Sequence, residues 1–193
     1  MLKSFMDISK SKIIASKKLV ISRELAQKHY KHLSEKPFFD WIIRYITCYD
    51  AFAFIIETPV SADEIRSGLG STMVEKAEKQ SLRGKYGLRA GMNGLHVSES
   101  ETVATEEIKL WEESGALKEG SLQFDVGSYT SEYGNSLDNT SRIHDFFDKL
   151  KDKGEIRSKA SKEFLYSALK DEAIGVEDHA FDRFFGIFWD MLM

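Results

Sequence analysis

Residues 51–57 read Ala-Phe-Ala-Phe-Ile-Ile-Glu, a nearly continuous run of apolar side chains. A run of this length and composition is typical of a strand that is buried on both of its faces. Shortly after it, Ser61 and Glu64 have the spacing of a helix capping box. We therefore predict a buried strand at 51–57 that leads into a helix over 62–68.

The residues before this strand predict a second strand and two short helices. Residues 12–21 (KIIASKKLVI) are rich in the β-branched side chains that favour strands. Ser22 can cap a helix that follows, because its hydroxyl can accept a hydrogen bond from a backbone N–H of the first turn. Pro37 interrupts that helix, and residues 38–46 predict another.

The residues after the capping box are less regular. Residues 71–92 carry many charges and show no clear period, which predicts a long loop. A short strand is predicted at 94–98 and a helix at 100–112. The order of these elements predicts an α+β sandwich in which helices cover an antiparallel sheet.

The C-terminal part of the chain differs in composition. Residues 115–140 are rich in Gly, Ser and Asn, which predicts a linker. Helices are predicted at 143–151, 159–171 and 176–193. The last of these carries an aromatic stripe that must be buried against another surface. We therefore expect a domain at 1–114, a linker at 115–142 and a helical C-terminal extension at 143–193.

The composition limits the classes of protein to which the chain can belong. Hydrophobic residues make up 42% and charged residues 30%, which is typical of a soluble globular protein. The net charge of -4 provides no basic field for nucleic acid. Cys48 is the only cysteine, which excludes an intrachain disulfide and favours a reducing compartment. No apolar run approaches the roughly 20 residues that span a bilayer, so we expect a cytoplasmic protein.

One histidine has neighbours suited to phosphate chemistry. His96 lies in the segment Asn-Gly-Leu-His-Val-Ser (93–98), and Arg66, Arg83 and Arg89 precede it. Guanidinium groups bind phosphate oxygens in a planar fork, and a histidine can form a covalent intermediate. An isolated histidine near a strand is more often structural, so spacing alone leaves both interpretations open. Nearby hydroxyl groups are those of Thr72 and Ser98.

Five segments of the chain resemble nucleoside diphosphate kinases, in the family's order and register. The segments are His29-Tyr30 with Pro37-Phe38-Phe39, Arg66 to Thr72, Leu82 to Gly87, Asn93 to Ser100, and Glu106 to Trp111. The fourth resembles the family's Asn-x-x-His-Gly-Ser-Asp-Ser signature. The spacing also matches, since 11 residues separate Arg83 from Thr72 and 13 separate it from His96.

The resemblance implies a ferredoxin-like antiparallel sheet and a phosphotransferase activity. The terminal phosphoryl group of a nucleoside triphosphate would pass through a phosphohistidine on His96 to a nucleoside diphosphate. Glu107 would be the second catalytic residue and orient the imidazole, and Mg²⁺ would arrive on the nucleotide phosphates without protein ligands. The implied nucleotide-binding residues are Tyr30 at the transfer pocket, Phe38 on the base, Arg66, Thr72 and Arg83 on the phosphates, Asn93 on the sugar, and Ser98. The resemblance also suggests a homo-oligomer.

The sequence departs from the family most clearly at its start. Family members begin with a strand that ends in Lys-Pro-Asp, whose lysine contacts the nucleotide. Pro37 and Pro59 are the only prolines here, so the sequence contains no Lys-Pro-Asp. We therefore expect the first strand of the sheet to be missing. Three explanations fit this absence: an incomplete gene sequence, a degenerate protein, or a C-terminal tail that fills the gap.

A second function is consistent with these departures. Lys85 replaces the family's Asp, and Val97 replaces a glycine next to the histidine. Together with the missing lysine and the added helices, these changes suggest a catalytically weakened nucleotide-binding or protein-interaction module on the same fold. The two hypotheses differ in whether His96 becomes phosphorylated.

Overall fold

Two antiparallel strands, β1 (Lys12–Leu19) and β2 (Ala51–Glu57), form the sheet. The structure is a computed structural model and describes residues 1–133, 137–151, 156 and 158–192. Lys12 pairs with Glu57, Leu19 pairs with Ala51, and a bulge lies between Ile13 and Ala15. The helices are α1 (Leu2–Ser9), α2 (Arg23–His29), α3 (Phe39–Ile46), α4 (Ala62–Leu69), α5 (Leu82–Tyr86), α6 (Glu101–Glu113), α7 (Val126–Tyr133), α8 (Thr140–Lys151), α9 (Lys159–Glu172) and α10 (Asp178–Met191), with 3₁₀ turns η1 (Lys31–Leu33) and η2 (Val74–Lys76).

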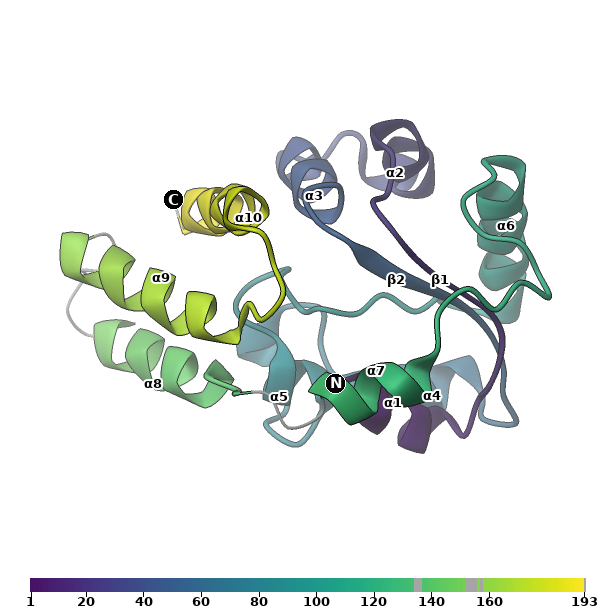
Figure 1. The fold of residues 1–193 in the computed structure, drawn as a ribbon, viewed down its shortest axis with the longest axis horizontal. Coiled ribbons are helices and arrows are strands. Elements are labelled where there is room, and N and C mark those ends of the chain that lie inside the picture. The colour runs from purple at the N-terminus through teal and green to yellow at the C-terminus, as the bar shows by residue number, and fades with distance from the viewer. Residues whose placement is uncertain (134–136, 152–155, 157, 193) are drawn as a thin grey trace.

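The predicted α+β class is confirmed by the arrangement of these helices. Figure 1 shows α2 and α3 on one side of the strands and α1 and α4 on the other. Phe5 of α1 and Ile65 of α4 belong to one buried cluster, against which Ile56 of β2 packs. Both faces of β2 pack against hydrophobic clusters, with Ile55 on one face and Ile56 on the other. The burial is less complete than predicted, because Ile55 is the only buried residue of β2 and its neighbours are partly exposed.

Local capping signals mark the first residues of α2 and α4, as predicted. The Ser22 hydroxyl accepts the Leu25 N–H at 3.2 Å and starts α2. At α4 the capping box is complete, since Ser61 accepts from the backbone of Glu64 and the Glu64 carboxylate accepts from the backbone of Ser61. Each such cap satisfies N–H groups that have no partner inside the helix.

The segment from 71 to 98 differs from its prediction in two ways. Within the predicted loop, Ser81 accepts the Gly84 N–H at 3.1 Å and caps the short helix α5. The strand predicted at 94–98 is absent, because the carbonyls there bind arginine side chains and not a neighbouring strand. Gly94 has φ 74°, a left-handed conformation that favours glycine and interrupts an extended segment.

The segment between α6 and α8, predicted as a linker, carries structure of its own. It contains α7, and Leu122 forms a parallel bridge with Ser16 of β1. The Ser16 amide donates to the Ser121 carbonyl at 3.0 Å, and the Ser16 hydroxyl donates to the Phe124 carbonyl at 2.8 Å. Residues 134–136 of the predicted linker lie outside the described residues. The division of the chain at 114 and 142 stays a prediction.

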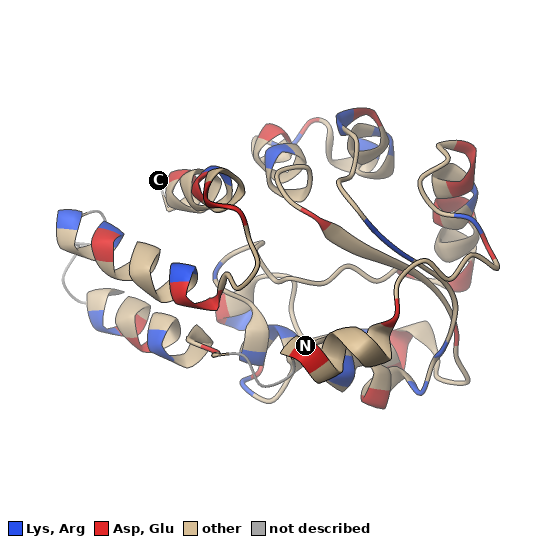
Figure 2. Cartoon of the chain, in the orientation of Figure 1, with Lys and Arg blue, Asp and Glu red and all other residues tan. Residues whose placement is uncertain are grey.

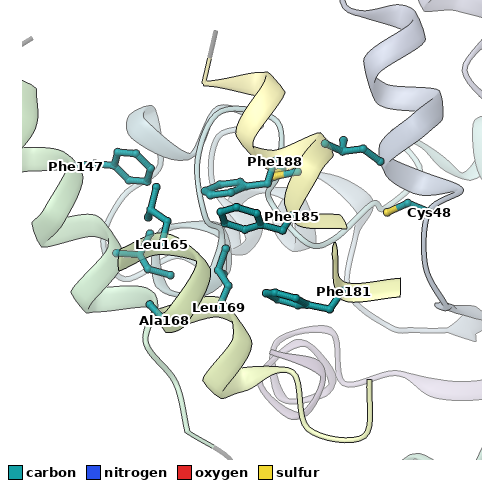
Figure 3. Packing of buried hydrophobic residues seen from close by; sticks show 11 residues of the cluster. Cys48, Phe147, Leu165, Ala168, Leu169, Phe181, Phe185 and Phe188 are labelled. Atoms are coloured by element: carbon teal, nitrogen blue, oxygen red, sulfur yellow. The ribbon is translucent and has the colours of Figure 1, made fainter. Parts of the chain in front are cut away.

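Helices α8, α9 and α10 share one hydrophobic core with the preceding part of the chain. Phe181, Phe185 and Phe188 of the aromatic stripe point toward Leu165 and Leu169 of α9 (Figure 3). The same cluster includes Cys48 and Met92, which lie before α6 in the chain. The predicted burial of the stripe is confirmed; Met193, at the end of the predicted helix, lies outside the described residues.

Polar contacts attach α10 to α3. The Trp41 indole N–H donates to the Ile187 carbonyl at 3.2 Å, and Arg44 pairs with Asp190 at 3.0 Å. Charges of both signs are spread over the helices (Figure 2), in keeping with the small net charge. None of the described helices has the length and apolar character needed to cross a membrane.

We expect Ile143→Ala in α8 to lower the free energy of unfolding by about 2 to 5 kcal/mol, because Ile143 is fully buried. Ile174→Ala is the matched control: Ile174 is 56% exposed, and its loss should change stability by less than about 0.5 kcal/mol. Urea unfolding of both variants measures the difference. Equal effects would show that α8 does not belong to the cooperative core.

Candidate active site

His96 is held between two arginines that bind the backbone on either side of it. Arg83 donates to the carbonyl of Leu95 at 2.9 Å, and Arg66 donates to the carbonyl of Val97 at 3.4 Å. The His96 side chain is 44% exposed, so its ring remains open to solvent. The structure therefore places two guanidinium groups against the backbone on either side of a histidine whose imidazole is accessible.

Arg83 also ties this segment to the end of α4. A second N–H of its guanidinium donates to the Gly70 carbonyl at 3.0 Å, and Arg83 as a residue is 8% exposed. Its Nε is buried and has no partner within the described residues, and each terminal nitrogen keeps a second N–H. Burial, with a contribution from Arg66, lowers the pKa of Arg83 below its usual value. Gly70 (φ 82°) cannot be replaced without strain, because an added Cβ would lie 2.2 Å from the Ser81 hydroxyl.

Glu107 of α6 holds the imidazole from the other side. One carboxylate oxygen, Oε2, lies 3.2 Å from Nε2 of His96 and accepts the Ser98 hydroxyl at 2.6 Å. Burial acts to raise the pKa of Glu107, but the hydrogen bonds from His96 and Ser98 outweigh it and the pKa is lowered. An ionised carboxylate can only accept, so Nε2 of His96 carries the proton and Nδ1 keeps a free lone pair.

Two further aromatic residues line the buried side of the site. The Tyr30 ring lies 6.0 Å from the His96 ring, and burial raises the pKa of Tyr30 to about 12. The His29 ring meets the His96 ring edge-on at 4.8 Å. His29 stands beside Tyr30 in a matched segment, but neither spacing nor periodicity indicated a role for it. Sequence reasoning therefore missed His29.

The remaining predicted residues lie in loops or turns. Asn93 donates to the Thr72 carbonyl at 2.9 Å, so those two residues are brought together. Phe38, just before α3, is 47% exposed, as a stacking surface would need to be. Arg89 pairs with Glu75 at 3.6 Å and covers the ring of Phe147 at 4.3 Å. Arg89 is therefore engaged by other partners, and its place beside His96 stays a prediction.

The arrangement of residues around His96 agrees with the family that comparisons with known proteins indicate. The family model described as nucleoside diphosphate kinase matches residues 3–116. The chain belongs to the nucleoside diphosphate kinase family. The kinase of Methanosphaera stadtmanae is 41% identical over 100 residues, which cover 52% of this chain and 66% of that protein. The kinase of Pelotomaculum thermopropionicum is 38% identical over 118 residues, which cover 61% of this chain and 79% of that protein.

Solved structures of nucleoside diphosphate kinases share the fold. The Halobacterium salinarum enzyme in complex with CDP has a TM-score of 0.54 and 28% identity, covering 66% of this chain and 84% of that chain. The apo enzyme of Encephalitozoon cuniculi has a TM-score of 0.53 and 30% identity, covering 57% of this chain and 74% of that chain. In sequence, the chain spans about two thirds of the length of several curated nucleoside diphosphate kinases that it matches.

We expect acid to destabilise the fold through His29. Burial, followed by the charge of His96, lowers the pKa of His29 from 6.5 to about 4. Between these values the unfolded chain binds a proton that the folded chain does not, so stability falls as pH drops from about 6.5 to about 4, by roughly 3 kcal/mol from this group. His29→Asn should remove that part of the pH dependence.

Chemical denaturation across this pH range measures the slope of the free energy of unfolding against pH. An overall loss of stability in the variant does not change this slope and so does not obscure the effect. His179→Asn is the control, because the His179 side chain is 68% exposed. A His29→Asn protein that loses stability with acid as steeply as the unmodified protein contradicts the assignment.

Proposed function

We propose that this protein transfers the terminal phosphoryl group of a nucleoside triphosphate to a nucleoside diphosphate through Nδ1 of His96. One observation supports this above all others: the proton-bearing Nε2 faces Glu107, and two guanidinium groups bind the backbone carbonyls on either side of the same histidine. A histidine placed in this way is a nucleophile with cations beside the position of the transferred group.

The reaction would proceed in two half-reactions that mirror each other. Nδ1 of His96 attacks the terminal phosphorus, a nitrogen–phosphorus bond forms, and the bond to the bridging oxygen breaks. The nucleoside diphosphate leaves with the electron pair of that oxygen. The ring keeps its proton on Nε2 and becomes cationic, and the Glu107 carboxylate at 3.2 Å stabilises this charge. A second nucleoside diphosphate then takes the phosphoryl group by the reverse step.

Arg66 and Arg83 would bind the oxygens of the transferred group, where negative charge is spread in the transition state. Arg83 keeps three N–H groups free of protein partners in the described structure, two of them on its terminal nitrogens. Thr72 is exposed in the loop after α4 and offers its hydroxyl to a phosphate. Tyr30 would limit the pocket on its buried side.

Phe38 and Asn93 would bind the other parts of the nucleotide, and Ser98 would act mainly through Glu107. Stacking on the exposed Phe38 ring does not depend on the base, because every base has a π-face. Asn93 would reach the sugar, and its amide is already oriented by the Thr72 carbonyl. The Ser98 hydroxyl donates its proton to Glu107. It could therefore contact a nucleotide only as an acceptor, through its oxygen, while that hydrogen bond is kept.

Mg²⁺ would enter as part of the nucleotide substrate. Within the described chain, the one group of His, Cys, Asp and Glu side chains close enough to hold an ion is His29, His96 and Glu107. Two of these three ligands are imidazoles, whereas Mg²⁺ prefers oxygen ligands and keeps several waters. The donor set therefore fits Mg²⁺ carried by the phosphates, where it would neutralise their charge. We also propose a cytoplasmic location and a homo-oligomer, for which the composition and the family resemblance are the support.

Incubation with γ-labelled ATP tests this function. We expect a label on the protein that is acid-labile and base-stable, that requires Mg²⁺, and that is lost in His96→Asn. His179→Asn, at an exposed position of α10, should be labelled like the unmodified protein. Undiminished labelling of His96→Asn would overturn the assignment. A folded protein that binds nucleotides but takes up no label would support the non-catalytic alternative.

Phe38→Ala should weaken nucleotide binding for all bases alike. Loss of one stacked base costs about 1 to 3 kcal/mol, so we expect KM for nucleoside diphosphates to rise roughly 5- to 150-fold while kcat changes little. Leu122→Ala removes another exposed apolar side chain, 66% exposed, and is the control. A selective loss for one base, or an unchanged KM, would be inconsistent with a stacking role.

A further inference from the structure

His29 is a buried histidine in contact with the site, and the proposed chemistry gives it no task. It is the last residue of α2, and its side chain is 6% exposed. Its ring lies edge-on to three others, at 4.7 Å from Tyr30, 4.8 Å from His96 and 6.0 Å from Trp111. A polar ring buried this deeply needs partners for its nitrogens, and those partners indicate what it does.

Trp111 determines which nitrogen of His29 carries the proton. The indole Nε1–H lies 3.3 Å from Nδ1 of His29, and an indole nitrogen can only donate. Nδ1 must therefore accept, and the neutral ring carries its proton on Nε2. Burial lowers the pKa of His29 to about 4, so the ring is neutral at physiological pH. Its one N–H is thereby directed away from Trp111.

That N–H faces the carboxylate which holds His96. Nε2 of His29 lies 3.6 Å from Oε1 of Glu107, which is longer than an ordinary hydrogen bond. Because the ring is neutral, the contact is that of an N–H dipole directed at the carboxylate, and not an ion pair. The other oxygen, Oε2, is bound by His96 and Ser98. Both oxygens of Glu107 are thus engaged, and rotation of the carboxylate would break contacts on both sides.

The same three side chains could be considered as a metal site, since their ligand atoms lie within 4.8 Å of one another. Ligation through Nε2 of His29 would require its proton to move to Nδ1. There it would point at the Trp111 N–H, and two donors would face each other at 3.3 Å. The hydrogen bonding therefore favours a neutral donor over a metal ligand at this position.

We infer that His29 is a positioning residue: its Nε2–H, fixed by Trp111, holds the Glu107 carboxylate in line with Nε2 of His96. The inference rests on the proposed function, because it concerns the orientation of the same nucleophile. His29 touches neither substrate nor transferred group. Without it, Oε1 of Glu107 loses its buried partner, the carboxylate can turn, and the proton on His96 is no longer confined to Nε2.

Two amide substitutions distinguish the roles of the two ring nitrogens of His29. The amide of His29→Gln reaches the position of Nε2 and can still donate to Glu107. The shorter His29→Asn can accept from Trp111 but cannot reach Glu107. Long-range ¹H–¹⁵N NMR spectra of His96 report its tautomer, and rapid-quench labelling with ATP reports its phosphorylation rate.

We expect the Nε2–H tautomer of His96 in the unmodified protein and in His29→Gln, with phosphorylation rates within a few-fold of each other. In His29→Asn a substantial Nδ1–H population should appear, and the rate should fall roughly 10- to 100-fold, as expected for a misplaced reacting group. If both variants lose activity equally without a change of tautomer, His29 is merely structural and the inference is overturned. A His29→Asn protein whose His96 tautomer and phosphorylation rate are unchanged overturns the inference as well.

Trp111→Phe provides a second test that leaves the His29 ring in place. Loss of the indole N–H should release Nδ1 of His29, so that both His29 tautomers become visible by NMR. A single Nε2–H tautomer in this variant would show that Trp111 does not determine the proton's position. The NMR measurements need no turnover, so they test the inference even if the protein takes up no phosphate, and the two failures can be told apart.

Discussion

The guanidinium of Arg83 is the contact on which the geometry of the site depends. It joins the carbonyl at the end of α4 to the carbonyl just before His96, two segments that are 25 residues apart in the sequence (Gly70 and Leu95). No strand holds residues 94–98, so these side-chain bonds take the place of sheet pairing. A charged group that binds two carbonyls in a buried setting makes stronger hydrogen bonds than a neutral donor would. The position of His96 is thus set by an arginine and not by a regular element.

Helix α6 supplies a second constraint from the opposite side. Its first turn is capped by Ser100, and Glu107 and Trp111, one turn apart, face the same side. One residue therefore binds His96 and the other binds His29. Helix α2 ends at His29, which contacts this face of α6. The orientation of the His96 imidazole therefore depends on how α2 packs against α6. A change at this helix contact would therefore alter the orientation of the His96 imidazole.

The sequence predicted the regular elements well and the irregular ones poorly. Both strands and the capped helices followed from local signals such as Ser22 and the Ser61–Glu64 pair, whose partners lie three residues away. The bonds from Arg66 and Arg83 to backbone carbonyls carry no such signal, because any residue offers a carbonyl. Those bonds replaced the strand predicted at 94–98. Resemblance to the family named His96 and Glu107, but it gave no reason for the tautomer of His29, which depends on a three-dimensional contact with Trp111.

The bonds that Ser16 makes with residues 121–124 affect how the molecule can associate. A strand at the border of a sheet presents unpaired N–H and C=O groups to which another polypeptide can add. At Ser16 the backbone N–H, the carbonyl and the side chain are all occupied by the chain itself. An incoming strand would first have to displace this segment. The segment thus covers the free edge of β1 at this one position.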